Sequence, residues 1–225
     1  MKFVEAPWLP QNDCSLFIID MKASAFKCQL NNSVLTKKHT KILPGTDSHP
    51  DMNVCHLGGK HIVVSKEHYS YYNESLSSFG FNVICGENNI SEKYPYDIAY
   101  NCVLLNKRLF HNLAYTDKAI LNFAEKNNYE LVNVKQGYTK CSTLIADKNS
   151  VITSDCGLYK IYKEYGIDAL YVDNKTIKLH NFDNGFIGGT GGLISKQKMA
   201  FFGNITLHPD YNNIREFLKK RNIEI

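Results

Sequence analysis

The sequence has no long apolar run. No stretch approaches the roughly 18 apolar residues that a membrane-spanning helix needs. Residues 1–10 also contain no extended apolar segment and no small-residue cleavage site of the kind that ends a signal peptide. We therefore expect no membrane partner, and the sequence predicts a cytoplasmic protein.

Cysteine pairs with the spacing of a disulfide framework or a metal site are absent too. The cysteines are odd in number and include no Cys-x-x-Cys pair; the seven lie at positions 14, 28, 55, 85, 102, 141 and 156. In a chain of 225 residues this pattern indicates reduced thiols. Because no two cysteines or histidines show ligand spacing with a matching second pair, we expect no metal and no other cofactor.

Clustered positive charge is scarce. The formal net charge is +4, and the lysines and arginines are scattered along the chain. The densest group, Lys219-Lys220-Arg221, is typical of the solvated last turn of a helix. A nucleic-acid site needs a basic stripe, so we expect no nucleic-acid partner.

The chain does contain a recurring pattern. Residues 185–194 (GFIGGTGGLI) resemble residues 136–145 (QGYTKCSTLI), and Leu193 lies 49 positions after Leu144. At the same offset a second apolar pair also matches. A repeat of about 40–50 residues indicates an array or a closed ring of similar units.

Two weaker copies of the unit start earlier in the chain, at Tyr94-Pro95-Tyr96-Asp97 and at His49-Pro50-Asp51-Met52. No linker rich in Pro, Gly or Ser divides the chain, so we expect a single domain over residues 1–225. The expected units are approximately 14–48, 49–93, 94–135, 136–184 and 185–225. In a ring, the segments that open the units would meet at the axis.

Each unit reads as strand, strand, helix, strand, with clear signals in four of the five. Gly80 and Gly166 are typical residues after the end of a helix, and Asp117 and Asp155 are typical residues before one. The predicted strands are 61–64, 81–84, 102–105, 109–113, 129–134, 142–146, 150–153, 169–172, 192–195 and 199–202. The predicted helices are 67–79, 116–127, 154–165 and 211–220. In the first unit only 16–19 reads as a strand, and 23–39 is irregular.

Four segments give the chain a family resemblance: His49-Pro50-Asp51-Met52, Tyr94-Pro95-Tyr96-Asp97, residues 136–142 and residues 185–189. Over roughly residues 40–225 the sequence resembles an uncharacterised branch of the pentein superfamily, the guanidino-group-modifying enzymes. These include arginine and agmatine deiminases, amidinotransferases and dimethylarginine hydrolases. The resemblance implies a five-fold pseudosymmetric α/β propeller.

The resemblance also implies a chemistry. Enzymes of this superfamily use a cysteine at the entrance of the last unit to attack a guanidinium carbon. A histidine transfers protons, and paired carboxylates hold the cationic substrate. Here the Gly-rich turn at residues 188–192 is present, but no cysteine follows it, because Cys156 is the last one in the chain. The usual nucleophile is therefore missing.

Cys141 is the candidate replacement, because it lies at the fourth entrance, where side chains would reach the axis. The alternative is a small buried residue at the start of a strand. His56 is the candidate proton-transfer residue and Asp51 a candidate cation-binding residue of the second entrance. Asp51 follows Pro50 and can equally be a turn residue.

The remaining candidates are substrate-binding residues. Asp97 and Asn101 lie at the third entrance, where each can instead serve the local backbone. Asp155 precedes a predicted helix and can be its cap. Gly189 and Thr190 belong to a Gly-rich run that either presents amides to an anion or permits close packing.

Two functions remain open. In the first, the protein binds or modifies a small cationic guanidino or amino-acid-like molecule in the axial cleft. In the second, it is a non-catalytic binding or scaffold protein, similar in architecture to the ribosome anti-association factor of archaea and eukaryotes. A metal-dependent hydrolase built on His56 and Asp51 is disfavoured, since ligand spacing is absent. The sequence does not determine the oligomeric state.

Overall fold

The computed structural model describes residues 2–23, 30 and 32–225 of the chain. Within these residues the strands form separate small sheets, none of which is closed. The strands are β1 (Phe17–Ile19), β2 (Ser33–Leu35), β3 (Val54–Gly58), β4 (His61–Val64), β5 (Asn82–Cys85), β6 (Val103–Leu105), β7 (Arg108–His111), β8 (Glu130–Asn133), β9 (Thr143–Asp147), β10 (Ser150–Thr153), β11 (Asp168–Tyr171), β12 (Gly191–Ser195) and β13 (Lys198–Phe201). The α-helices are α1 (Pro50–Asn53), α2 (Tyr69–Ser77), α3 (Lys118–Lys126), α4 (Cys156–Glu164) and α5 (Tyr211–Lys219). Short 3₁₀ turns are η2 (Lys66–His68), η3 (Ile187–Gly189) and η4 (Ile205–Leu207).

Three of the sheets have the same construction. In each, an antiparallel hairpin is followed by a helix, and the chain returns as a third strand parallel to the second: β3-β4-β5, β6-β7-β8 and β9-β10-β11. The last unit has the hairpin β12-β13 and helix α5, and it closes with a parallel bridge from Lys198 to Glu224 in place of a full strand. The predicted strand-strand-helix-strand order is therefore complete in three units, and the last unit has its two strands and its helix.

The first unit differs from the others. Its sheet has two parallel strands, β1 and β2. β2 lies inside the segment that we expected to be irregular, so this part of the expectation was wrong. Most of the preceding segment, residues 24–29 and 31, falls outside the described residues.

Local sequence signals set the ends of the elements. Gly80 and Gly166, which follow α2 and α4, have φ of 87° and 71°, a region that glycine adopts without strain. The hairpin between β6 and β7 turns through Asn106 and Lys107, both at positive φ, as a two-residue type I′ turn requires.

The core lies between successive sheets. Alternate residues of a strand point to opposite faces, so Val103 and Leu105 of β6 pack with β9, β10 and α4, whereas Leu104 packs with β3, β4 and α3. Similar apolar clusters join the first sheet to the second and the fourth to the fifth. Each unit thus completes the core of its neighbour.

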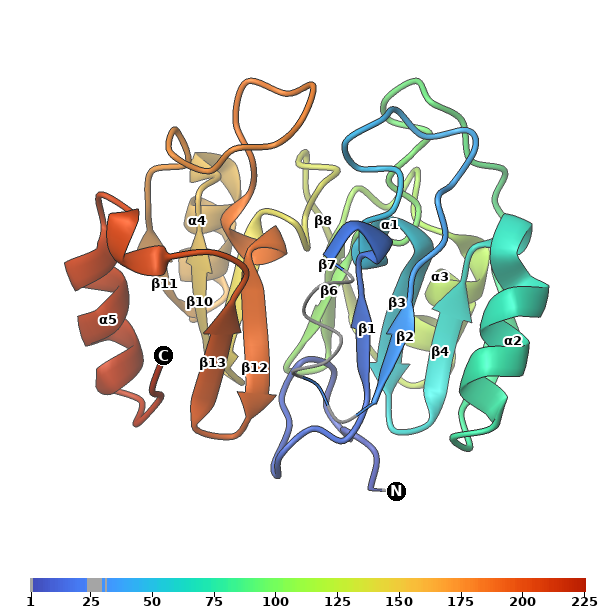
Figure 1. Cartoon of the computed structure of the whole chain (residues 1–225), viewed down its shortest axis with the longest axis horizontal. Helices are drawn as coiled ribbons and strands as arrows, with labels where there is room; N and C mark the ends of the chain where they lie inside the picture. Colours follow the sequence, from blue (N-terminus) through green and yellow to red (C-terminus); the bar gives the residue numbers. More distant parts are fainter. Residues whose placement is uncertain (1, 24–29, 31) are drawn as a thin grey trace.

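Figure 1 shows how this arrangement positions the connections. Helices α2 and α5 lie at the two ends of the long axis. The segments that lead from β2 to β3, from β5 to β6 and from β11 to β12 gather at the upper end of the strands, opposite the N-terminus. Within the part of the chain that the structure describes, no helix has both the length and the apolar character required to cross a membrane.

Asp117 and Asp155 cap helices, as predicted. Because their surroundings differ, we expect replacement of each by alanine to lower the free energy of unfolding by a different amount. Asp117 is fully buried; one oxygen accepts from Ala119 N (2.8 Å) and the other from the amides of Glu87 and Asn88 (both 2.9 Å). Asp155 accepts from Leu158 N (2.7 Å) at a partly exposed position. We expect Asp117→Ala to lower the free energy of unfolding by about 2–4 kcal/mol and Asp155→Ala by about 1 kcal/mol.

Urea unfolding of both variants measures this difference. Exposed Asp13 provides the control, since Asp13→Ala should change the free energy of unfolding by less than about 0.5 kcal/mol. Equal losses in the free energy of unfolding for Asp117→Ala and Asp155→Ala would contradict the larger stabilising role that we give to buried Asp117.

Candidate functional site

The second entrance places two polar side chains close together at the start of the short helix α1. His49 precedes a proline, which keeps its backbone extended (ψ 137°), and Pro50 begins the helix. Asp51 follows in the first turn and is 8% exposed. The sequence His-Pro-Asp therefore fixes both the direction of the chain and the position of the carboxylate.

Cys141 contacts this carboxylate from the fourth entrance. Its Sγ donates a hydrogen bond to Asp51 Oδ2 at 3.0 Å, although the two residues are 90 positions apart. Cys141 is only 1% exposed. Burial, followed by the negative charge of Asp51, raises the pKa of the Cys141 thiol well above its ordinary value. Cys141 is therefore a neutral thiol and a hydrogen-bond donor.

Asn101, from the third entrance, holds Cys141 in place. Its Oδ1 accepts from the backbone amides of Lys140 (2.8 Å) and Cys141 (3.0 Å), and its Nδ2 donates to Cys141 Sγ (2.9 Å). Asn101 is completely buried. Three entrances that lie far apart in the sequence therefore meet at one thiol.

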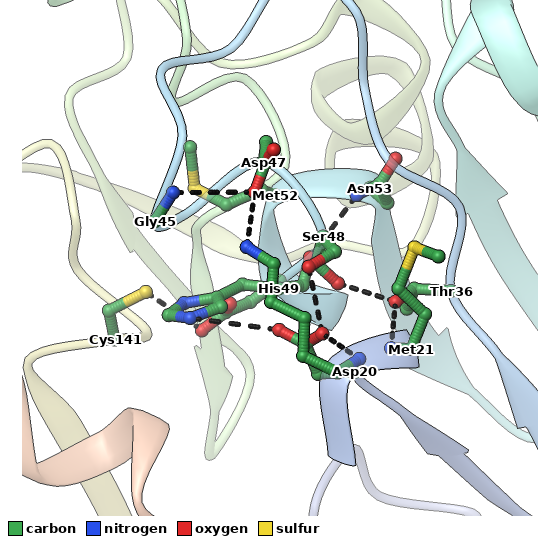
Figure 2. Close-up of polar contacts among 12 residues, drawn as sticks. Asp20, Met21, Thr36, Gly45, Asp47, Ser48, His49, Met52, Asn53 and Cys141 are labelled. Atoms are coloured by element: carbon green, nitrogen blue, oxygen red, sulfur yellow. Dashed lines mark hydrogen bonds and ion pairs between the residues drawn. The ribbon is translucent and has the colours of Figure 1, made fainter. Parts of the chain in front are cut away.

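His49 adds a nitrogen to the group. One ligand-type atom each from His49, Asp51 and Cys141 lies within 4.8 Å of the others. His49 Nε2 also lies 3.8 Å from Asp20 Oδ2, and Figure 2 shows the His49 side chain between those of Cys141 and Asp20. We call Asp20, His49, Asp51, Asn101 and Cys141 the Cys141 cluster.

Hydrogen bonds from the first unit fix Asp20. Its Oδ1 accepts from Ser48 Oγ (2.7 Å) and from Lys22 N (2.8 Å). Lys22 Nζ in turn donates to Asp47 Oδ1 at 2.6 Å. Burial alone would raise the pKa of Asp47, but the hydrogen bond and charge of Lys22 outweigh it, so this pKa is lowered.

A second carboxylate lies beside the fourth entrance. Asp97 is 3% exposed, its Oδ2 accepts from Tyr138 Oη at 2.5 Å, and its Oδ1 has no partner. Burial raises the pKa of Asp97 in spite of the tyrosine hydrogen bond. The Tyr138 ring packs between Tyr94 and Phe186, with centroids 5.7 and 5.4 Å away.

The Gly-rich turn adjoins the cluster through its backbone. A Cβ on Gly188 would lie 2.3 Å from Thr143 O, so only glycine fits there. Gly189 N donates to Cys141 O at 3.1 Å. Thr190 Oγ1 donates to Ile187 O at 2.7 Å, so its hydroxyl serves the local turn.

Two predicted residues lie elsewhere. His56 is on β3, where Nε2 contacts Gly59 O at 3.0 Å within its own hairpin and the ring packs on Phe81. Asp155 caps α4 and also accepts from Gln136 Nε2 at 2.8 Å. The structure thus brings Asp51, Asn101, Cys141 and Gly189 together but leaves His56 and Asp155 outside the Cys141 cluster.

Sequence reasoning missed His49, Asp20 and Tyr138. His49 stood in the quoted His-Pro-Asp segment, and its place next to Asp51 was the available signal. Asp20 gave none, because it reaches the cluster only through the packing of the first unit against the second.

Comparisons with known proteins identify a family and a fold. A model of a family of unknown function, DUF6873, matches residues 18–225. The chain belongs to this family. No curated protein matches it.

Solved structures identify the fold of this DUF6873 chain. A dimethylarginine dimethylaminohydrolase adduct is 8% identical at a TM-score of 0.56, covering 90% of this chain and 78% of the other. C. jejuni agmatine deiminase is 11% identical at a TM-score of 0.52, and the match covers 98% of this chain and 87% of the deiminase chain. The amidinotransferase SxtG from Microseira wollei is 9% identical at a TM-score of 0.52, and the match covers 90% of this chain and 71% of the amidinotransferase chain. The chain has a mixed α/β fold shared with pentein superfamily members, as predicted.

The turn that carries Cys141 depends on a neutral histidine. His111 is fully buried; its Nδ1 lies 2.7 Å from Thr116 Oγ1 and its Nε2 lies 2.9 Å from Gly137 O. Burial lowers the pKa of His111 to about 4. The neutral ring therefore donates from Nε2 to Gly137 and accepts at Nδ1 from the threonine hydroxyl.

We expect acid to destabilise the protein through His111. Its pKa is lower in the folded state than the ordinary 6.5, so the native state binds fewer protons than the unfolded chain. The contribution is complete above pH 6.5 and is lost as the pH falls toward 4, by about 3 kcal/mol in total. Urea unfolding of wild type and His111→Gln between pH 7 and 4.5 tests this.

His39, His56 and His68 also have lowered pKa values through burial. They are present in both proteins, so their effect cancels in the comparison. Parallel pH curves for wild type and His111→Gln would contradict the role of His111.

Proposed function

We propose that this protein binds and modifies a small guanidino compound, with Cys141 as a relocated nucleophile. The observation that carries the proposal is the hydrogen bond of 3.0 Å from the Cys141 thiol to Asp51, with a His49 ring nitrogen within 4.8 Å of both. A thiol, a base and a carboxylate are the groups that attack on a planar cation requires.

The substrate itself would activate the thiol. A guanidinium bound against Asp51 places positive charge beside Cys141, and a nearby cation lowers the pKa of a thiol. The Cys141 proton then passes to His49, which Asp20 orients across 3.8 Å. The sulfur attacks the guanidinium carbon, an amine leaves with the proton from His49, and an amidino thioether remains on Cys141. Water or an acceptor amine attacks that carbon and releases the sulfur.

Asp97 supplies a second anion for the substrate. Its Oδ1 is buried without a partner, and a buried polar oxygen in that state costs free energy until a donor arrives. The neighbouring rings of Tyr94, Tyr138 and Phe186 add aromatic surface, which attracts a planar cation. These groups favour a guanidinium over a compact ammonium.

We also infer that the sheets form the blades of a five-fold propeller, which brings the entrances to one axis. The repeated order of elements supports this arrangement. So does the contact between the two ends of the chain: Cys14 N, just before β1, donates to Ile194 O of β12 at 2.8 Å. Asn181 Nδ2 also donates to Pro44 O at 3.0 Å, linking the segments before β12 and β3.

A second candidate function is binding without catalysis. The burial of Cys141 and the raised pKa of its thiol favour it, since a neutral, covered sulfur is a poor nucleophile. In that case Asp51 of the Cys141 cluster and the neighbouring Asp97 would hold a cationic ligand without any reaction of the thiol.

Affinity labelling separates the two functions. We expect chloroacetamidine, a guanidinium-like electrophile, to alkylate Cys141 at least about tenfold faster than iodoacetamide does, relative to exposed Cys156 in the same molecule. Asp51→Asn should lower this ratio of labelling rates at least about tenfold, because it removes a charge-assisted contact with the amidine. Peptide mapping by mass spectrometry measures both rates.

Cys141→Ser should abolish the selective label, and His56→Gln, a histidine outside the cluster, should leave it unchanged. If the amidine reacts with Cys156 as fast as with Cys141, the nucleophile is wrong and the binding function gains support.

A further inference from the structure

The residues of the Cys141 cluster also match the donor set of a soft divalent cation. Cysteine, histidine and aspartate each offer one atom, and the three atoms lie within 4.8 Å of one another. Thiolate and imidazole select Zn²⁺ or Co²⁺ over Mg²⁺ and Ca²⁺. We propose that His49, Asp51 and Cys141 form a zinc site, a role that the spacing of histidines and cysteines in the sequence did not predict.

The distances suit zinc after a small adjustment. Tetrahedral bonds of about 2.0–2.3 Å separate two ligand atoms by roughly 3.2–3.8 Å. Cys141 Sγ and Asp51 Oδ2 are already 3.0 Å apart. The His49 side chain is 22% exposed, which leaves it room to turn toward the pair. Asp51 and Cys141 are buried, so a bound ion would be shielded from water on that side.

The charges balance as well. Zn²⁺ replaces the proton that Cys141 donates to Asp51, and this proton leaves to the solvent. One thiolate, one carboxylate and a neutral imidazole then neutralise the two positive charges of the ion. The ion and its three protein ligands are therefore neutral together.

The surrounding residues act as ligand-positioning groups. A metal-bound histidine usually has a carboxylate on its second ring nitrogen, and Asp20 stands beside the His49 ring (3.8 Å), fixed by Ser48. Asn101 holds the sulfur from the other side. Three protein ligands leave a fourth position open, which is typical of a zinc site that takes water or a small molecule.

The inference concerns the same atoms as the proposed function but does not depend on it. Asp51 and Cys141 cannot hold a guanidinium and a metal ion together, so zinc would compete with the cationic substrate. Zinc binding is measured directly and does not require any reaction of the thiol.

The test uses the full chain, first stripped of metal with a chelator and then titrated with Co²⁺, and with Zn²⁺ against a chromophoric chelator. We expect one Co²⁺ per chain, a thiolate-to-cobalt charge-transfer band and the strong visible bands of a tetrahedral ion. Calorimetry in buffers of different ionisation enthalpy should show about one proton released per Zn²⁺.

Variants locate the ion. Cys141→Ser should abolish the charge-transfer band, and His49→Gln and Asp51→Asn should each weaken Zn²⁺ binding at least about tenfold. Asp20→Asn should weaken it by a smaller factor, up to about tenfold. His56→Gln and Cys156→Ser are the matched controls and should bind as wild type does. Circular dichroism of each variant verifies that it is folded.

The Cys55–Cys102 pair, with sulfurs 3.3 Å apart, is the competing site. A band that persists in Cys141→Ser and disappears in Cys102→Ala would overturn the proposal, as would the absence of stoichiometric binding to wild type. A cobalt band at Cys141 together with unselective amidine labelling would reject the proposed function and keep the metal site. Selective labelling that Zn²⁺ does not slow would reject the metal site and keep the function.

Discussion

The hydrogen bonds of Asn101 are the constraint on which the candidate site depends. This buried side-chain amide accepts hydrogen bonds from the backbone N–H groups of Lys140 and Cys141, and it donates one to the sulfur of Cys141. It therefore fixes both the turn and the side chain that the turn presents. Without it, two buried amides would lose their acceptor, which is expensive in a region closed to water. The third unit thus determines where the Cys141 side chain of the fourth unit points.

Asp51 and Asp97 are buried carboxylates that form no ion pair with a lysine or arginine among the described residues, although the buried Lys140 lies near Cys141. Asp51 is paired with a neutral thiol, and one oxygen of Asp97 has no partner. Asp47, in contrast, is balanced by Lys22 and Lys38 at 2.6 and 3.5 Å. A cation in the Cys141 cluster would give Asp51 a charged partner. The proposed guanidinium and the proposed zinc ion would each supply positive charge next to Asp51.

Much of the local structure could be predicted from the sequence, because its signals are local. Asp117 and Asp155 cap helices, and Gly80 and Gly166 end them, as the residue types indicate. The predicted strands 61–64 and 150–153 match the observed ones, and the ends of the other predicted strands lie within two residues of theirs. The sequence analysis did not predict strand β3, the first strand of the second unit, although β3 pairs antiparallel with the predicted strand β4.

The candidate site was predicted only in part. Asp51, Asn101 and Cys141 were found because unit entrances recur in the sequence, whereas His56 was chosen for its chemistry and lies in a hairpin. His49 was missed although it stands in the same His-Pro-Asp segment as Asp51, because that segment was interpreted as a turn.

The sequence by itself determined the repeating units, the helix ends and the absence of a cysteine after the last Gly-rich turn. These properties depend on residues within about 50 positions of one another. Only the tertiary structure decided that His49, Asp51 and Cys141 lie together, with Asp20 behind the histidine. The reason is physical: contacts between residues 90 positions apart form when apolar faces of successive sheets pack, and that packing leaves no local trace in the chain.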